Sequence, residues 1–319
     1  MDFINIAKEV LLIEAKELEI AASNISSEIE KAVHLISESK GKLIITGVGK
    51  SGLVGGKLAA TFASTGTSSF FLHPTEAMHG DLGMISPGDI VLAISYSGES
   101  EELKTLLPHL KRFDIPLIAM ARDMNSTLGS YSDIFLNISI TKEACPLNIA
   151  PTSSTTLTMA LGDALAVCLM KHNRFEKEDF ASFHPGGSLG KKLFIKVDDL
   201  LQKDNLPIVP CGTQLKDAIV VMSEGRLGNA IIVENGKVIG LLSDGDLRRA
   251  MMSNNFSMQC KAEDIATLNP KKIKNKNLLA SDALKIVEDY KIQLLLVVDE
   301  NDKLEGVLHI HKLVEAGIK

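Results

Sequence analysis

The chain has 319 residues, of which 45% are hydrophobic and 23% are charged, and its formal net charge is −6. This length predicts two or three domains, and the composition is typical of a soluble globular protein. The negative charge argues against a nucleic-acid partner held through phosphate contacts. No uncharged apolar run reaches the roughly 20 residues that span a bilayer, so we expect no membrane partner.

The four cysteines are widely spaced and form no Cys-x-x-Cys pair. This pattern favours a reducing, cytoplasmic location and offers no metal framework. The first residues lack a basic start followed by an apolar core, so we expect no signal peptide.

Apolar periodicity predicts the elements of the N-terminal half. Residues 2–39 read as one helix that stops before Gly41. Five short apolar runs then predict strands at residues 42–46, 70–72, 90–94, 117–120 and 134–136. Residues 73–82 read as a polar loop, and a long helix is expected from the Thr/Ser-rich turn at 151–156 to about residue 171. Strands that alternate with helices predict an α/β fold, a doubly wound parallel sheet that binds ligands at the carboxyl ends of its strands.

A serine-rich turn at residues 95–100 follows the third predicted strand and precedes an amphipathic helix. Such a turn presents free backbone N–H groups and the positive end of a helix dipole. The hydroxyls of Ser95, Ser97 and Ser100 add donors, and Gly98 allows a ligand to approach the backbone closely. We interpret the turn as a phosphate cradle; the alternative is a serine-rich helix cap without a ligand.

A glycine-rich turn, Gly47–Gly52, follows the first predicted strand. It fits G-x-G-x-x-G, but the next strand is followed by His73 and Glu76 and not by an acidic residue placed for a ribose. It is not a Walker loop, because Ile44 stands where that loop needs a glycine. Two such turns on adjacent strand ends favour one phosphorylated ligand, with Lys50 beside it.

Five further polar side chains are candidates, although each alone is more consistent with a structural role than with a functional one. They are His73 and His79 in the polar loop, Glu102 in the helix after the serine turn, Glu143 near a proline, and His184 in a His-Pro-Gly-Gly turn.

The character of the chain changes near residue 197, where an internal repeat begins. Two copies, offset by about 65 residues, each predict a helix, two strands and a second helix. The predicted domains are therefore an N-terminal domain at 1–196 and two smaller α+β modules at 197–259 and 260–319.

Taken together, the turns at 47–52 and 95–100 and the stretches at 143–147, 151–156 and 184–190 resemble the arabinose 5-phosphate isomerases of the KdsD/KpsF type. The resemblance covers essentially the whole chain, and it includes residues 243–249 of the first repeat. It implies an N-terminal sugar isomerase (SIS) domain with a five-stranded parallel sheet, followed by a tandem pair of CBS modules. The implied reaction interconverts D-ribulose 5-phosphate and D-arabinose 5-phosphate, which feeds Kdo synthesis for lipopolysaccharide or capsule.

The resemblance also implies the site residues. The catalytic residues it implies are Lys50, Glu102, Glu143 and His184. The substrate-binding residues it implies are Ser51, Gly66, Thr67, His79, Ser95, Ser97, Gly98, Ser100, Thr152 and Ser153. The resemblance implies that no cofactor is required, and that zinc, which relatives bind at the position of His73, is not needed for turnover. His184 is expected to reach a neighbouring subunit within a homotetramer.

The implied chemistry suits these residue types. Moving a proton between C1 and C2 through an enediol needs a base, a group that protonates and polarises the oxygens, and an anchor for the phosphate. Glu143 or Glu102 would move the carbon-bound proton, His184 or His79 would serve the oxygens or ring opening, and Lys50 would stabilise enediolate charge. The two glutamates are not ranked by the sequence.

Two questions stay open at this point. The CBS pair is either the site of a nucleotide or sugar-nucleotide effector or a packing and oligomerisation module. The alternative to an enzyme is a non-catalytic SIS sugar-phosphate sensor, although no basic helix-turn-helix precedes residue 40. Another sugar-phosphate isomerase with a SIS domain is a further alternative.

Overall fold

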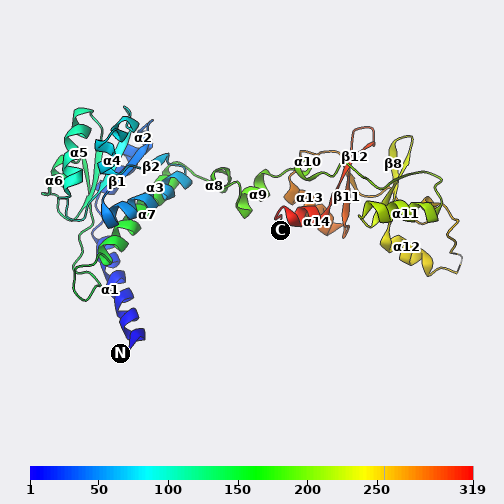
Figure 1. Ribbon diagram of the computed structural model, residues 1–319, viewed down its shortest axis with the longest axis horizontal. Helices are drawn as coiled ribbons and strands as arrows, with labels where there is room; N and C mark the ends of the chain where they lie inside the picture. Colours follow the sequence, from blue (N-terminus) through cyan, green and yellow to red (C-terminus); the bar gives the residue numbers. More distant parts are fainter. Residues whose placement is uncertain (255, 319) are drawn as a thin grey trace. The chain divides into compact units, whose positions relative to one another are not determined.

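The computed structural model describes residues 1–254 and 256–318, and it divides into two compact units, Met1–Phe180 and Ala181–Lys319. Figure 1 shows both units, coloured from blue at the N-terminus to red at the C-terminus.

The first unit is built from helices on both sides of one sheet. Its helices are α1 (Phe3–Ser23), α2 (Glu28–Glu38), α3 (Gly49–Ser64), α4 (Pro74–Met78), α5 (Glu101–Arg112), α6 (Thr127–Tyr131) and α7 (Ser153–His172), with the 3-10 helix η1 (Asp81–Met84). Its strands are β1 (Leu43–Gly47), β2 (Ser69–Phe71), β3 (Ile90–Ile94), β4 (Leu117–Ala121) and β5 (Ile134–Asn137). Helix α8 (Lys177–Phe183) crosses the boundary between the units.

The sheet has the order β2-β1-β3-β4-β5, and each neighbouring pair is parallel. This confirms the predicted doubly wound five-stranded sheet. The chain reverses its direction of travel across the sheet between β1 and β3, which is the topological switch point where such folds bind ligands. Gly47 pairs with Ile94 at the carboxyl ends of these two strands. The predicted glycine-rich and serine-rich turns therefore begin side by side.

Both faces of the sheet are buried, which explains why the strands read as continuous apolar runs. Leu43 and Ile45 of β1 pack in a core with residues of α2, α3 and α7, while Ile44 between them packs in the core that contains the leucines of α5. The alternation follows from the period of two in a strand. Figure 1 shows α3 and α7 lying close together against the sheet.

Two local predictions were wrong. The helix expected over 2–39 is interrupted after Ser23, because the polar residues there bond locally and compete with the helix: the Asn24 side chain donates to the Ile20 carbonyl at 3.0 Å. The loop expected over 73–82 contains α4 and η1. His73 Nδ1 accepts the Thr75 N–H at 3.3 Å, and Pro74 is the first residue of α4, which are both helix-start signals.

The second unit contains the internal repeat. Its helices are α9 (Ser188–Phe194), α10 (Val197–Leu200), α11 (Leu215–Gly225), α12 (Asp244–Met251), α13 (Ala280–Asp289) and α14 (Ile310–Glu315), with η2 (Ala262–Asp264). Its strands are β6 (Ile208–Pro210), β7 (Asn229–Glu234), β8 (Lys237–Ser243), β9 (Thr267–Leu268), β10 (Lys272–Ile273), β11 (Leu294–Val298) and β12 (Leu304–His309). The series α11-β7-β8-α12 and α13-β11-β12-α14 confirm the predicted helix, two strands and helix in each copy.

The two copies exchange their leading segments. Val197, which precedes the first copy, packs in the core of the second, and its N–H donates to the Leu278 carbonyl at 2.9 Å. Ala262, which precedes the second copy, packs in the core of the first, and its N–H donates to the Thr213 carbonyl at 2.9 Å. A domain boundary drawn between the two repeats therefore separates residues that share a core.

Helix α7 is long and apolar enough to cross a membrane by length and composition alone. Half of the apolar window is buried inside the structure, and the helix packs against the sheet through residues such as Leu161 and Leu165. These contacts are those of a core helix.

Candidate active site

A cavity of about 550 Å³ lies at the carboxyl ends of β1 and β3, and we call it the central cavity. It is bounded by the start of α3, the serine turn, the segment after β5 and the start of α7. Its lining includes Lys50, Ser51, Ser95, Ser97, Ser100, Arg122, Thr141, Lys142, Glu143, Asn148, Ser154, Thr155 and Thr158. The volume is in the range of small-molecule sites.

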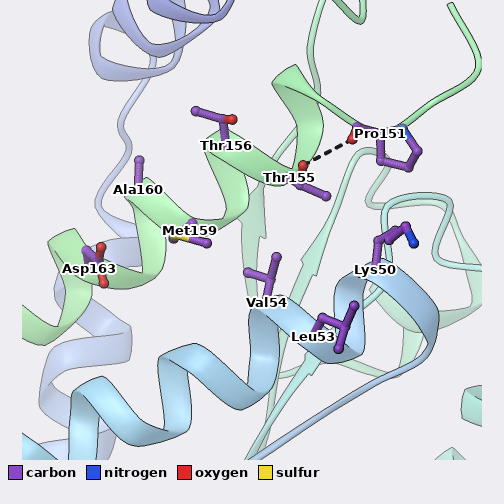
Figure 2. A pocket seen from close by; sticks show the side chains of 9 residues that line it. All are labelled: Lys50, Leu53, Val54, Pro151, Thr155, Thr156, Met159, Ala160 and Asp163. Carbon is purple, nitrogen blue, oxygen red and sulfur yellow. Dashed lines mark hydrogen bonds between the residues drawn. The ribbon is translucent and has the colours of Figure 1, made fainter. Parts of the chain in front are cut away.

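Lys50 lies in the first turn of α3, at the mouth of the central cavity. It also lines a second cavity of about 410 Å³ between α3 and α7, which shares Val54, Pro151 and Thr155 with the first. Figure 2 shows Lys50 and Leu53 on α3 across from Pro151 and Thr155 at the start of α7. The side chain of Lys50 is exposed, so its ammonium group is available to an anion that enters from either cavity.

The serine turn is held in shape by its own hydrogen bonds. Ser95 is 3% exposed, and its hydroxyl lies 2.8 Å from the Ser100 hydroxyl. The Gly98 N–H donates to the Ser95 carbonyl at 3.1 Å and lies 3.2 Å from the Ser95 hydroxyl. Gly98 has φ +73°, and a Cβ there would collide with the Ser126 side chain, so only glycine fits this turn.

Glu99 ties the serine turn to α6. Its carboxylate accepts the Thr127 N–H at 2.7 Å and the Thr127 hydroxyl at 2.9 Å, and Lys104 Nζ lies 2.8 Å away. The bond from Lys104 and those from Thr127 lower the pKa of Glu99 to about 2. Glu99 is thus ionised at neutral pH and acts as an anchor for the turn.

Glu143 is held at the start of α7. Its carboxylate accepts the N–H of Thr152 at 2.8 Å, the hydroxyl of Thr152 at 3.0 Å, the N–H of Ser154 at 3.2 Å and the hydroxyl of Ser154. Burial alone would raise the pKa of Glu143, but these four donors outweigh it and lower the pKa below its ordinary value. The carboxylate is therefore ionised and fixed in position beside the cavity.

Arg122 and Lys142 join Lys50 in the lining of the central cavity, where Glu143 is the lining carboxylate. Both were missed by the sequence reasoning. Arg122 follows the carboxyl end of β4, and its guanidinium lies 5.6 Å from the centre of the Tyr96 ring of the serine turn. Its place after the carboxyl end of a predicted strand was an available signal, but no glycine-rich or serine-rich turn follows directly to mark a ligand edge. In the described part of the chain, three cations and one carboxylate line this cavity, which suits it to an anion.

The structure brings together six of the predicted site residues and places two more next to them. Lys50, Ser51, Ser95, Ser97, Ser100 and Glu143 line the central cavity. Thr152 and Ser153 lie at the start of α7; Thr152 bonds Glu143, and the Ser153 hydroxyl is buried without a hydrogen-bond partner in the described structure.

Several predicted residues of the first unit lie outside the lining of the central cavity, and Gly98, which is buried within the serine turn, is one of them. Glu102 is exposed in the first turn of α5. His79 is exposed at the end of α4, beyond β2. Gly66 and Thr67 lie between α3 and β2, at the amino ends of the strands, because α3 carries the chain back across the sheet. They are at the edge opposite to the cavity.

His73 is the residue for which zinc was considered. Its Nδ1 accepts the Thr75 N–H, so that nitrogen caps α4. Among residues 1–254 and 256–318, no group of three or more His, Cys, Asp or Glu side chains is arranged to hold a metal ion. The donor set of this chain around His73 does not fit a zinc site.

His184 belongs to the second unit, where it follows α8. Its carbonyl accepts the Gly187 N–H at 3.0 Å. A Cβ at Gly190 would collide with the same carbonyl, so the His-Pro-Gly-Gly turn is tightly packed, as its sequence predicts.

Comparison with known proteins agrees with this architecture. The SIS domain family matches residues 35–168, and the CBS domain family matches residues 197–253 and 263–319. The arabinose 5-phosphate isomerase KdsD of Francisella tularensis is 45% identical over 320 residues, covering 99% of this chain and 98% of its own length. KdsD of Pseudomonas aeruginosa is also 45% identical over 320 residues, covering 100% of this chain and 98% of its own length.

A solved structure resembles the first unit. The E. coli CFT073 protein c3406, determined in complex with arabinose 5-phosphate, is 41% identical and superimposes with a TM-score of 0.57. It covers 58% of this chain and 98% of its own length. With KdsD relatives aligned along its whole length, the chain belongs to the arabinose 5-phosphate isomerase family, and it carries a SIS domain and two CBS domains.

Proposed function

We propose that this protein is an aldose–ketose isomerase that interconverts D-ribulose 5-phosphate and D-arabinose 5-phosphate through an enediol and so supplies Kdo biosynthesis. The observation that carries the proposal is the central cavity at the switch point of the sheet, where Lys50, Arg122 and Lys142 line the same cavity as a fixed carboxylate. Full-length relatives named as arabinose 5-phosphate isomerases support the same reaction.

In this proposal the phosphate binds at the serine turn. The turn precedes the N-terminus of α5, whose free N–H groups and dipole favour an anion. Ser97 and Ser100 add hydroxyl donors, and Arg122 and Lys50 add positive charge from the neighbouring strand ends. A phosphate held there leaves the sugar carbons to extend toward Glu143 at the other side of the cavity.

Glu143 is our candidate for the base that moves the carbon-bound proton. It lines the cavity and is ionised, which a base requires, and its four donors hold it in one orientation. The same donors also make Glu143 a weaker base. If Glu143 serves only to orient the loop, Glu102 is the alternative base. Lys50 would stabilise the negative charge of the enediolate.

We keep His184 and His79 as proposed groups for the oxygen protons or ring opening, on the resemblance alone. The same resemblance supports a homotetramer in which His184 serves a neighbouring subunit, and a cytoplasmic location. We also propose that turnover needs no cofactor or metal.

The test is turnover of D-arabinose 5-phosphate by the purified full chain in the presence of EDTA, beside Lys50→Ala and His184→Ala. We expect turnover in the parent and a loss of at least about 100-fold in each variant. Saturable binding without turnover would support the sugar-phosphate sensor in place of the enzyme. Activity on a different sugar phosphate alone would refute the assigned substrate.

We further propose that the CBS pair binds a nucleotide or sugar nucleotide. A cavity of about 400 Å³ in the second unit is lined by Asp244, Arg248, Arg249, Lys271 and Lys291, among others. Its cations suit phosphates, and its carboxylates suit ribose hydroxyls. Calorimetric titration with AMP and with CMP tests this. The absence of saturable heat with both nucleotides, or a heat that is unchanged in Arg248→Ala, would favour a packing and oligomerisation module.

A further inference from the structure

The N-terminal helix α1 buries a charged residue and exposes apolar ones. Glu17 is 3% exposed, whereas Phe3, Leu11 and Leu12 of the same helix are 72%, 67% and 70% exposed. Burying an ionised carboxylate is costly unless donors compensate for the lost water. The position of Glu17 therefore points to a specific partner rather than to general burial of the helix.

That partner is the segment that leads from β5 into the active site. Glu17 Oε2 accepts the Thr141 N–H at 2.9 Å, and Glu17 Oε1 accepts the Thr141 hydroxyl and the Lys142 N–H, the latter at 3.3 Å. Thr141, Lys142 and the next residue, Glu143, all line the central cavity. One buried carboxylate thus holds the backbone immediately before the candidate base.

The segment from residue 138 to residue 152 contains no helix or strand, so its shape depends on such anchors. At its far end, Glu143 is bonded to Thr152 and Ser154 at the start of α7. At its near end, the described structure gives Glu17 as the side chain that binds the backbone of 141 and 142. Glu14, one turn earlier on α1, accepts the Thr156 hydroxyl at 3.1 Å and holds the same helix against α7.

We propose that Glu17 is a positioning residue for the isomerase reaction: through Thr141 and Lys142 it fixes the loop that presents Lys142 and Glu143 to the substrate. The proposal rests on the proposed function for its catalytic consequence. Glu17 does not line the central cavity and does not itself take part in the chemistry.

The experiment compares Glu17→Gln with Glu19→Gln, a matched change on the same helix, where the side chain of Glu19 is 69% exposed. Glutamine keeps the size of the side chain, but an NH2 group replaces one carboxylate oxygen. That group cannot accept the N–H and O–H donors that Glu17 binds. We expect kcat/KM for D-arabinose 5-phosphate to fall by about 10-fold or more in Glu17→Gln and to be unchanged in Glu19→Gln, with similar Tm values. Thr141→Val should lose a comparable factor, and the double variant should lose no more than either single variant, because the two side chains act as one unit.

Amide hydrogen exchange provides a second readout that needs no turnover. In Glu17→Gln, amides of residues 138–152 should exchange about 10-fold faster, whereas those of α7 should not change. A Glu17→Gln chain with parental kcat/KM and parental exchange would overturn the proposal, as would a lowered Tm with unchanged kcat/KM. If Glu17→Gln does not fold, Thr141→Val takes its place, because it keeps the carboxylate. Its kcat/KM and its amide exchange rates then decide the proposal. A parent without turnover would refute the proposed function instead, and the exchange rates would then decide the role of Glu17.

Discussion

Glu143 and Thr152 are joined by two hydrogen bonds: the Glu143 carboxylate accepts the Thr152 N–H at 2.8 Å and the Thr152 hydroxyl at 3.0 Å. The same hydroxyl accepts the N–H of Ala144, the residue after Glu143, at 2.8 Å. The loop before α7 is thereby closed on itself, and a carboxylate is fixed at the rim of the central cavity. This small network gives Glu143 a defined position.

Glu143→Gln removes the charge but keeps the shape of this network. We expect kcat on D-arabinose 5-phosphate to fall by about 100-fold or more, because the base is lost. The Tm should fall by only a few degrees, because glutamine still accepts one set of donors. Steady-state kinetics and thermal unfolding test this, with Glu30→Gln on α2 as the control. Turnover within about twofold of the parent, in a folded chain, would transfer the role of base to Glu102.

Gly98→Ala should damage both stability and the phosphate site. The added Cβ would meet Ser126 Oγ, and φ +73° is unfavourable for alanine. We expect a loss of about 1–3 kcal/mol in the free energy of unfolding and a raised KM. Gly56→Ala, in the interior of α3 where a Cβ meets nothing within 4 Å, is the control and should be neutral or stabilising. Equal denaturation midpoints for the two variants would contradict this account of the turn.

Glu99 predicts a specific pH dependence of stability. Its pKa in the folded state is about 2, against an ordinary value of 4.5. Because the folded-state pKa is depressed, the stabilisation by ionised Glu99 is fully present above about pH 4.5 and is lost as the pH falls toward 2. The Tm of Glu99→Gln should therefore lie below that of the parent at pH 7 and approach it as the pH falls from 4.5 toward 2. A Tm difference that does not change with pH would mean that the carboxylate charge plays no part.

The cysteines should differ in reactivity. Backbone N–H groups of Ile149 and Ala150, with those of Leu147 and Asn148, lower the pKa of Cys145, whereas burial raises the pKa of both Cys211 and Cys260. Because the thiolate is the reactive form, iodoacetamide at neutral pH should modify Cys145 before the other two. Mass spectrometry of peptides from a time course tests the order. Modification of Cys211 first would contradict it.

The sheet and its two polar turns were predictable because each depends on local sequence. The strands are buried on both faces and read as continuous apolar runs, and the glycines and serines that end β1 and β3 mark the ligand edge. The sequence alone therefore places Lys50, Ser95 and Ser100 together at this edge.

The remainder of the site depends on contacts between distant parts of the chain. Glu17 lies 124 residues before Thr141, on a helix where apolar spacing drew attention to other positions. Arg122 follows a strand without a glycine or serine to mark a ligand turn. Gly66 and Thr67 were expected at the site, but the length of α3 returns the chain to the opposite edge of the sheet.

The measurement that tests the central claim most directly is proton NMR of D-arabinose 5-phosphate incubated with the full chain in D2O. An enediol reaction run by a protein base predicts formation of D-ribulose 5-phosphate with deuterium at C1, and slow loss of the C2 proton from the remaining aldose. The conversion should continue in EDTA and should disappear in Lys50→Ala. An aldose spectrum that stays unchanged with the parent protein, or a ketose that forms without any solvent deuterium, would contradict the account.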